Sequence, residues 1–573
     1  MALAAERAKY GLPAEFKVTR EMKRTFTPAE KSMHKTAYEI GGSKRANEVM
    51  RVYFAKKKAA AAREAAGGAA PSEAGSNNGG KAEESVPEAA AGFSASTRAS
   101  NPPPAPKPKA PAPAIETTEV ALGESNPSGH LMYSGSVDWD NLGKKAADAE
   151  TCLWNFHRLM EGTRVRFVAS GAGACHAVCV DDGGKLYAWG RNDAGQLGLG
   201  DLNSRAVPQE VAGLNGFKIR HASCGRRHTL VCTEEGAMFS WGSHKAGQLG
   251  TGVKVNDGSA VPVKVAATSG SSRVTRVACG AEFCMAVNEE GFVAAWGHPM
   301  YGQLGNRSNG EYIERAGSTS YHYETVPNVV KFDGVPLSES PNVVDVVCGN
   351  NHTVAMTSEG AVFTWGFAGY GRLGHNSQKD LMSPLELDVF SVSKSRNPRM
   401  GAKMITAGAT CSYALSAGGQ MFFWGRTKAS GEATMYPKPL HDLNGWSIRS
   451  FSCGNNSSFV IADDAVITWG PSPTYGELAY GDPKCNNPKS STIPKLVDSM
   501  QGAHAHMVAA GYGFAVLIVD DSDKSKEVTE KHALFEPAET VILNSNAPEE
   551  PVKGAKKRSA EKKETPSAKK GKK

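Results

Sequence analysis

The chain has 573 residues, including 62 glycines and 31 prolines, with 40% hydrophobic residues and a net charge of +7. This length exceeds one ordinary hydrophobic core but allows only a few domains. The charge is uneven, because residues 1–60 and 551–573 each carry +8 whereas residues 131–520 carry −1. This distribution argues against a globular body built to clamp nucleic acid, and it favours basic arms that contact something acidic.

Membrane and secreted classes are disfavoured by the same inspection. No run of about 18 apolar residues is present, so we expect no membrane insertion. The first ten residues carry charges within their short apolar stretch, which is unlike a secretory signal. Eleven cysteines, an odd number, indicate a reducing compartment such as the cytosol or nucleus.

Residues 1–66 are predicted to form a basic, partly helical arm. Thr27-Pro28-Ala29-Glu30 has the pattern of a helix start, with a capping residue followed by proline. A second helix would place four residues on one face, namely Ala46, Val49, Met50 and Tyr53. Helices this short are marginal in water, so a frayed helix and a partner-docking helix both remain open. Residues 67–129 are rich in alanine and proline and are predicted to be a disordered linker.

Residues 130–520 contain an internal repeat. Its first marker is a Trp-Gly pair, found at Trp189-Gly190, Trp241-Gly242, Trp296-Gly297, Trp365-Gly366, Trp424-Gly425 and Trp469-Gly470. The first three pairs lead to Gly-Gln-Leu-Gly, and weaker copies follow at Gly371-Arg372-Leu373-Gly374 and Gly476-Glu477-Leu478. Successive tryptophans are 52, 55, 69, 59 and 45 residues apart, which is typical of a repeat architecture.

A second marker precedes each Trp-Gly pair. It is clearest at Cys224-Gly225, Cys279-Gly280, Cys348-Gly349 and Cys453-Gly454, with looser copies at Gly171 and Gly408 and a seventh copy at Gly511. Alternating runs separated by polar-Gly turns, such as Glu235-Gly236, lie between the two markers. Because such turns need positive φ, each repeat is predicted to contain a β-hairpin.

The seventh copy of the second marker lacks a following Trp-Gly pair, and the missing piece lies at the front of the repeat region. Ser134-Gly135 keeps the glycine spacing of the Trp189 unit, with Ser134 in the tryptophan position. The N-terminal strand can therefore complete the sheet begun by residues 511–520. We predict an all-β, seven-bladed β-propeller in which N- and C-terminal strands share one blade, which removes exposed sheet edges. Short N-terminal helices, a disordered linker and a disordered tail would flank it.

These repeats resemble the regulator of chromosome condensation family, which forms seven-bladed propellers. The resemblance covers about residues 130–520 and includes the stretches from Trp365 to His375, Thr434 to Lys438 and Trp469 to Leu478. It implies a cell-division protein of the nucleus, chromosomes and centromere, with a spindle or cytoplasmic pool. It also implies binding to, or nucleotide exchange on, a Rac- or Ral-like small GTPase. Exchange needs no covalent chemistry, only tighter binding to the nucleotide-free GTPase.

Other chemistry has weaker support in the sequence. The glycine-rich loops contain no P-loop or dinucleotide fingerprint. We therefore interpret these glycines as residues that allow strand ends and turns to pack closely. The cysteines of the second marker occur once per blade, which disfavours a zinc cage and predicts no metal site. His176, His228 and His352 recur at one position and are interpreted as structural hydrogen-bonding groups. We predict no catalytic residues, no cofactor and no covalent catalysis.

Two irregular loops and the C-terminus are the candidate partner sites. The loops are Gly310–Pro341 and Ser391–Lys403, the second of which carries Lys394, Arg396 and Arg399. Residues 521–573 are predicted to be an acidic bridge followed by a basic, disordered tail. The tail residues that could serve nuclear import or chromatin contact are Lys556, Lys557, Arg558, Lys562, Lys563, Lys569 and Lys570. A solubilising tail and solvated loops are the simpler alternatives.

Two functional hypotheses follow. In the first, a monomeric propeller engages a small GTPase and basic arms direct it to chromosomes or spindle. In the second, the propeller is a protein-interaction scaffold for chromatin or cytoskeleton, without GTPase activity.

Overall fold

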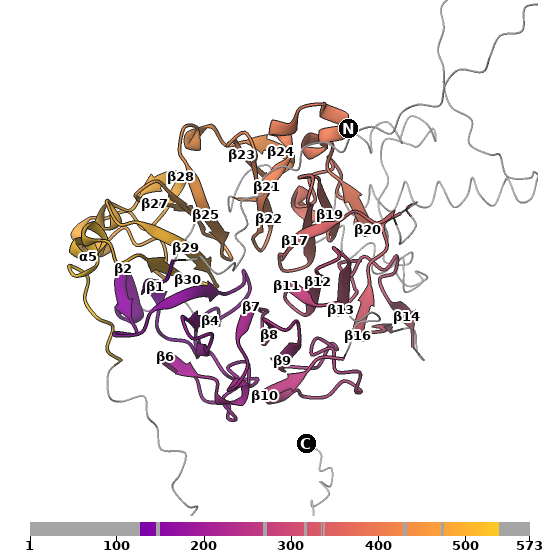
Figure 1. The fold of residues 1–573 in the computed structure, drawn as a ribbon, viewed down its shortest axis with the longest axis horizontal. Helices are drawn as coiled ribbons and strands as arrows, with labels where there is room; N and C mark the ends of the chain where they lie inside the picture. Colours follow the sequence, from indigo (N-terminus) through magenta and orange to yellow (C-terminus); the bar gives the residue numbers. More distant parts are fainter. Residues whose placement is uncertain are drawn as a thin grey trace, which may run out of the picture. The chain divides into compact units, whose positions relative to one another are not determined.

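A computed structural model describes residues 127–144, 149–266, 272–314, 318–333, 335, 339–427, 433–471 and 475–537. The predicted N-terminal arm, all but the end of the linker, and the basic tail lie outside these residues. Within them, seven four-stranded antiparallel sheets are arranged around a central axis, which confirms the predicted seven-bladed propeller (Figure 1). No helix of the described residues is long and apolar enough to span a membrane.

The innermost strand of each blade lines the central channel. From blade one to blade seven these strands are β3 (Val165–Ala169), β7 (Ile219–Cys224), β11 (Val274–Cys279), β17 (Val343–Cys348), β21 (Ala402–Ala407), β25 (Ile448–Cys453) and β29 (Ala505–Ala510). The second strands are β4 (His176–Asp181), β8 (His228–Thr233), β12 (Phe283–Asn288), β18 (His352–Thr357), β22 (Cys411–Ser416), β26 (Ser458–Ala462) and β30 (Phe514–Val519).

The third strands carry the Trp-Gly pairs. They are β5 (Leu186–Gly190), β9 (Met238–Gly242), β13 (Val293–Gly297), β19 (Val362–Gly366), β23 (Met421–Gly425), β27 (Ala465–Gly470) and, in blade seven, β1 (His130–Ser136). The outer strands are β6 (Arg205–Glu210), β10 (Ser259–Lys264), β16 (Glu324–Val329), β20 (Leu381–Glu386), β24 (Thr434–Pro439), β28 (Ser491–Leu496) and β2 (Cys152–Leu159).

Smaller elements occupy the connections between these strands. In the described part of the chain the α-helices are α4 (Val392–Ser395) and α5 (Asp523–Thr529), and a separate hairpin consists of β14 (Glu311–Ile313) and β15 (Thr319–Tyr321). The 3-10 turns are η1 (Ala149–Thr151), η2 (Ala212–Leu214), η4 (Gly369–Gly371), η5 (Asp388–Phe390), η6 (Pro398–Met400), η7 (His441–Leu443), η8 (Pro483–Cys485) and η9 (Asp498–Met500).

Blade seven closes the ring as the sequence predicts. Its strand order is β2-β1-β30-β29, so two strands come from each end of the propeller. Ser134 pairs with Ala515 just as Trp241 pairs with Thr229 in blade two, which places Ser134 in the tryptophan position. The sheet edges that an open array would expose are thereby paired.

The hydrophobic core is divided among the junctions between neighbouring blades. Seven clusters of buried side chains form, and each joins two adjacent blades. Trp189, Trp241, Trp296, Trp365 and Trp424 are completely buried in five of them, and Trp469 lies in a sixth. The cluster between blades six and seven contains Phe156 and Phe459 in place of a tryptophan. Six junctions therefore bury the tryptophan of a Trp-Gly pair, and the seventh buries phenylalanine side chains instead.

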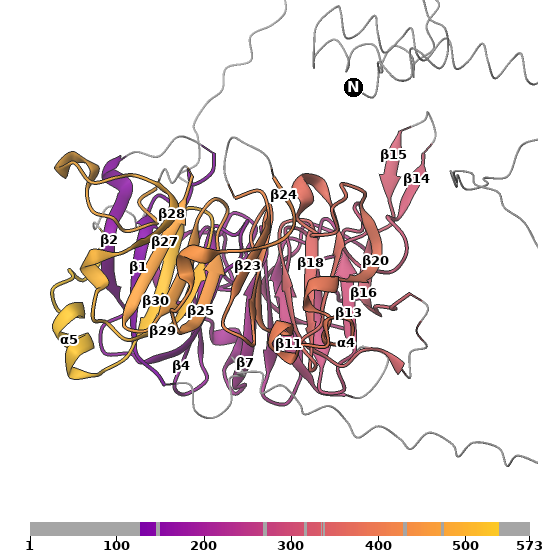
Figure 2. The ribbon, with the colours of Figure 1, turned by 90° about the horizontal axis from the view of Figure 1, so that it is seen from above.

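The strand order gives the propeller two distinct faces. The first–second strand turns and the third–fourth strand loops lie on one face, which we call the motif face. The second–third turns and the connections from each outer strand to the next blade lie on the opposite face, which we call the crossover face. Figure 2 shows the β14–β15 hairpin projecting from the motif face and α4 lying on the crossover face.

Candidate functional sites

Hydrogen bonds between blades connect three of the Trp-Gly tryptophans to the Gly-Gln-Leu-Gly unit of the preceding blade, whereas Nε1 of Trp189 and of Trp424 has no partner among the described residues. The indole Nε1 of Trp241 donates to the main-chain carbonyl of Gln196 at 2.8 Å. Trp296 and Trp365 donate in the same way to Gln248 and Gln303, each at 2.9 Å. In blade seven the hydroxyl of Ser134 donates to the carbonyl of Glu477 at 3.1 Å, so it takes over the indole's role. Each bond satisfies a buried polar pair, which would otherwise cost about 1–3 kcal/mol.

The glycines of these units permit close approach between elements. Gly242 has a φ of 100°, and a Cβ there would lie 2.4 Å from the carbonyl oxygen of Arg227. A Cβ at Gly250 would lie 2.6 Å from Nε1 of Trp296. Both positions therefore require glycine for packing, which accounts for them without a phosphate ligand.

The recurring histidines link neighbouring blades. Nε2 of His176 lies 2.8 Å from the Thr229 hydroxyl, and Nε2 of His352 lies 2.9 Å from the Ser412 hydroxyl. Each hydroxyl in turn donates to a carbonyl oxygen, that of Gln196 or that of Arg372. The hydroxyl proton is thus used, so each histidine must donate its Nε2 proton. Burial lowers the pKa of His176 to about 3 and lowers that of His352 as well, which keeps both rings neutral.

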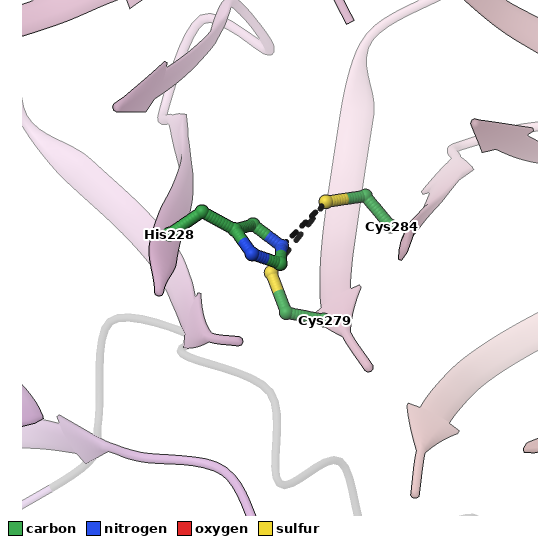
Figure 3. Close-up of side chains that lie close together, drawn as sticks. All are labelled: His228, Cys279 and Cys284. Atoms are coloured by element: carbon green, nitrogen blue, oxygen red, sulfur yellow. Dashed lines mark hydrogen bonds between the residues drawn. The ribbon is translucent and has the colours of Figure 1, made fainter. Parts of the chain in front are cut away.

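At the junction of blades two and three, the same positions hold two cysteines and a histidine (Figure 3). Nε2 of His228 lies 3.1 Å from Sγ of Cys284, which lies 3.8 Å from Sγ of Cys279. The three ligand atoms lie within 4.8 Å of one another, and all three residues are buried. Burial by itself would raise the pKa of Cys279. The hydrogen bond with Cys284 and the contact with His228 have the larger, opposite effect, so the pKa of Cys279 is lowered.

Because the second marker supplies one cysteine per blade, the spacing of these cysteines predicted no metal site and gave no indication of this cluster. The cysteine of the second marker meets two further positions in space, namely the histidine that begins the second strand of the preceding blade and the second residue of the next strand in its own blade. Cys279 and Cys284 are also direct partners across β11 and β12. Aligning the repeats would have shown that His228, Cys279 and Cys284 occupy the three positions that meet at one junction between blades.

The central channel opens on the motif face into a shallow depression. The channel encloses about 290 Å³ and is lined by all seven innermost strands, with His221, Arg276, Asp345 and Lys403 among its polar residues. The depression, of about 400 Å³, is lined by residues of the first–second strand turns, including Arg226, Glu282 and Asn350. This face therefore combines polar turns with a concave centre.

An aromatic and cationic cluster lies on the same face. The Arg426 guanidinium lies 3.9 Å from the ring centre of Tyr370, and Arg372 lies 4.6 Å from that of Phe367. Tyr370 has a φ of 63°, takes a position between two glycines, and is 43% exposed. A tyrosine held in this left-handed conformation at the surface costs stability, and it presents an aromatic ring to solvent.

The two candidate partner loops meet only in part: the hairpin of the first lies on the motif face, whereas its end returns to the crossover face, where Phe332 and Pro341 line a pocket together with Lys394. The stretch Gly310–Pro341 is also more than a loop, because it contains the β14–β15 hairpin and then the outer strand β16 before it returns to the crossover face. The longer spacing between Trp296 and Trp365 concealed this, since the outer strand follows an inserted hairpin. Interpreting the whole stretch as an irregular loop was therefore wrong.

The basic residues of Ser391–Lys403 lie around α4 on the crossover face. Lys394 is neutralised within its own blade, with Nζ 2.6 Å from Asp388 and 3.3 Å from Glu386. Arg396 and Arg399 are exposed, and no ion pair with another described residue is present for either. Of the three predicted positive charges, only these two are free of carboxylates in the described part of the chain.

The propeller body also extends beyond residue 520, where its end was predicted. Helix α5 follows β30, and the segment after it pairs with the outer strand β2 through a parallel bridge between Arg158 and Leu534. The His532 ring lies 2.7 Å from the Phe156 carbonyl oxygen and 3.0 Å from that of Ser499. We call residues 523–536 the strap. The basic tail residues from Lys556 to Lys570 lie outside the described residues.

Comparisons with known proteins agree with this architecture. A family model of the RCC1-like domain matches residues 124–517. Protein RCC2 of Homo sapiens is 44% identical over 437 residues, which are 73% of this chain and 81% of the human protein. The Xenopus laevis homologue is 41% identical over 437 residues, 73% of this chain and 83% of that protein.

Solved structures share the fold at lower identity. Human WBSCR16 superposes with a TM-score of 0.56 at 20% identity, covering 68% of this chain and 100% of that one. Prp20p of Saccharomyces cerevisiae also has a TM-score of 0.56 at 20% identity, covering 72% of this chain and 96% of that one. The chain therefore belongs to the class of seven-bladed β-propellers. More narrowly, the chain belongs to the RCC1-like domain family.

Proposed function

We propose that this protein is a cell-division regulator that binds a small GTPase of the Rac or Ral type through its motif face and promotes nucleotide release. The observation that carries the proposal is the match to the RCC1-like domain over the whole propeller, together with RCC2 relatives. Prp20p, whose fold is similar, was described together with its binding to Gsp1p and histones. These facts support a protein partner and a chromatin partner for this chain.

Apart from those on the outer strands, more large exposed apolar side chains lie on the motif face than on the crossover face. Leu202, Val253, Ile313 and Tyr370 lie on the third–fourth strand loops of the motif face and are 43–77% exposed. On the crossover face, Phe217 is 41% exposed and packs on Phe239 with ring centres 4.9 Å apart. Exposed apolar and aromatic side chains are common anchors of protein interfaces. The depression on the same face adds polar groups to these apolar side chains.

A nucleotide-release assay with the full chain tests this proposal. Rac- and Ral-type GTPases are loaded with a fluorescent GDP, and release is followed with and without the chain in excess unlabelled nucleotide. We expect accelerated release from at least one GTPase, because an exchange factor binds the nucleotide-free form more tightly. No acceleration on any GTPase would favour the scaffold alternative, and absence of binding to every GTPase would contradict the proposed partner as well as the proposed exchange.

Paired variants locate the binding face. Tyr370→Ala combined with Ile313→Ser removes two exposed motif-face side chains and is expected to weaken GTPase binding by about tenfold or more, the effect of losing about 1.4 kcal/mol. The matched control, Arg396→Ser with Arg399→Ser, changes two exposed residues of the crossover face. The opposite pattern of effects would place the partner on the crossover face.

We propose further that the basic tail directs the protein to the nucleus and chromosomes by contacting DNA phosphates. The ten basic residues of 551–573 provide the charge. If 6–10 phosphate contacts form, the affinity for DNA should fall by roughly 10³–10⁵ between 50 and 200 mM salt. Deleting residues 551–573 should flatten this dependence and reduce nuclear localisation of a tagged chain. Unchanged salt dependence in the truncated chain would rule out the tail as the main DNA contact.

A further inference from the structure

The buried cluster at the junction of blades two and three has the composition of a metal site. We propose that His228, Cys279 and Cys284 bind one Zn²⁺ ion inside the propeller. This role is separate from partner binding, because the cluster lies within the core rather than on either face. All three residues are at most 4% exposed.

The spacing of the donor atoms matches zinc coordination. With Zn–S bonds of about 2.3 Å and tetrahedral angles, two thiolates on one zinc ion lie about 3.8 Å apart. The distance between Sγ of Cys279 and Sγ of Cys284 is 3.8 Å. Nε2 of His228 lies 3.1 Å from Sγ of Cys284, within a few tenths of an ångström of the separation that zinc requires. The third pair, Nε2 of His228 and Sγ of Cys279, lies within 4.8 Å, so side-chain rotations can bring the three donors around one ion.

The charge of this donor set favours a divalent ion. Two thiolates and one neutral imidazole carry a charge of −2, which Zn²⁺ neutralises completely. Neutrality matters because an uncompensated charge in a buried site is costly. A monovalent soft ion such as Cu⁺ would leave a net negative charge in the same place. Zinc is also bound by cysteine and histidine in structural sites with closed coordination.

The repeat supplies an internal comparison for this cluster. At every junction the fold brings together the same three positions, and the residues there differ. The junction of blades one and two has His176, Cys224 and Thr229, and the junction of blades three and four has Phe283, Cys348 and Thr353. At the junction of blades two and three all three positions carry metal-ligating atoms. The hydroxyl found at the neighbouring junctions has been replaced by a thiol.

The surroundings offer a fourth ligand and a partner for the histidine. The main-chain carbonyl oxygen of Gln248 lies 3.4 Å from Sγ of Cys284 and also accepts from the Trp296 indole. Nδ1 of His228 is buried and has no hydrogen-bond partner among the residues that the structure describes. A Cβ at Gly225 would lie 2.5 Å from this Nδ1 and 2.7 Å from the Gly280 carbonyl oxygen, so both atoms border one small space. That oxygen can accept the Nδ1 proton once Nε2 binds metal.

Zinc content of the full-length chain tests the proposal directly. The chain is purified with a phosphine reductant, dialysed against EDTA, and analysed for metal by mass spectrometry. We expect about one zinc per chain, retained under native conditions because the site is enclosed, and released to a zinc dye in guanidinium. Refolding with Co²⁺ in place of zinc should give a thiolate-to-cobalt charge-transfer band in the near ultraviolet.

Substitutions to the residues that other blades have at the same repeat positions test whether the ion binds at this cluster. His228→Phe, Cys279→Ala and Cys284→Thr each introduce the residue that another blade has at that position, and each should lose the bound zinc and the cobalt band. The matched control is Cys453→Ala, which removes the blade-six cysteine of the same position as Cys279 and should retain both. If a variant fails to fold, the cobalt band of the unmodified chain still reports thiolate ligation.

Several outcomes would overturn the proposal. These are the absence of zinc both after native purification and after refolding with Zn²⁺, and zinc content that is unchanged in Cys284→Thr. Stoichiometric Cu⁺ binding with exclusion of Zn²⁺, or a disulfide joining Cys279 to Cys284 in the reduced preparation, would do the same.

Discussion

Glu477 is the residue at which this chain departs most informatively from its own repeat. It occupies the position of the glutamine in Gly-Gln-Leu-Gly and is 3% exposed. Its Oε2 accepts from the Tyr475 main-chain nitrogen at 3.1 Å, as the Gln196 side chain accepts from Ala194 at 2.8 Å. Burial raises its pKa to about 7. The carboxyl group therefore resembles the glutamine only while it is protonated.

Replacing Glu477 with glutamine should stabilise the protein in a pH-dependent way. The unfolded chain ionises near pH 4.5 and the folded chain near 7. Stability therefore falls as the pH rises through this interval and stays lower above it, by about 3 kcal/mol at most. Thermal unfolding of Glu477→Gln should show a clear rise in Tm at pH 8 and little change at pH 4.5. An equal shift at both pH values would contradict the assignment.

The junction residues show which contacts a sequence can reveal. The tryptophans, and Ser134 in the tryptophan position, could be placed because side-chain identity repeats with a fixed spacing. Their acceptors could not, because the carbonyl oxygens of Gln196 and Gln248 belong to the main chain and leave no signature in residue type. The zinc cluster was missed for a related reason, since its donors come from two blades and become neighbours only in the folded ring.

Among the strands, the outer ones face the greatest risk of pairing with another chain. Six of the seven carry a proline at the fourth residue, listed here in blade order as Pro208, Pro262, Pro327, Pro384, Pro437 and Pro494. Proline has no N–H to offer to a foreign strand, so it protects a sheet edge. The register places Phe156 of β2 at this position in blade seven. That edge therefore depends on the strap.

Removing the strap should expose this edge. A chain that ends at residue 522 loses the main-chain bonds from Arg158 to Ala533 and from Phe535 to Arg158, each 2.9 Å long. We expect a lower Tm and concentration-dependent self-association, measured by thermal unfolding and light scattering. A chain that ends at residue 537 is the matched control and should behave like the full chain. Identical behaviour of the two truncations would show that the strap does not protect the edge.

The strap also shows why the predicted end of the propeller fell short. The repeat pattern stops at residue 520, and the acidic composition of the following segment favours a solvated bridge. Ser522 nevertheless caps α5 by accepting from the Ser525 nitrogen. His532 then reaches two carbonyl oxygens of the propeller. These contacts follow no repeat and could be seen only once β2 was known to be an edge.

At the scale of the whole molecule, the propeller is nearly neutral and the two ends of the chain are basic, so the charge lies outside the part that folds as a ring. Closure depends on β1 and β2, which supply half of blade seven. The Tyr133 ring stacks on Phe514 with centres 5.9 Å apart, and Trp139 contacts Phe514 edge-on at 5.3 Å. Without these strands, β29 and β30 would be a two-stranded hairpin, which is marginal in water.

A chain that begins at residue 161 should therefore lose more than a local element. Its β30 edge is unpaired, the carbonyl of Glu477 loses the Ser134 hydroxyl, and the cluster around Phe514 opens to solvent. We expect a broadened thermal transition and self-association through the open edge. A chain that begins at residue 127 keeps both strands and should unfold like the full chain. Adding residues 127–160 in trans should restore a monomeric, cooperative protein, because the missing strands re-form blade seven. If the chain from residue 161 is already monomeric with the full Tm, closure by shared strands is not what holds the ring together.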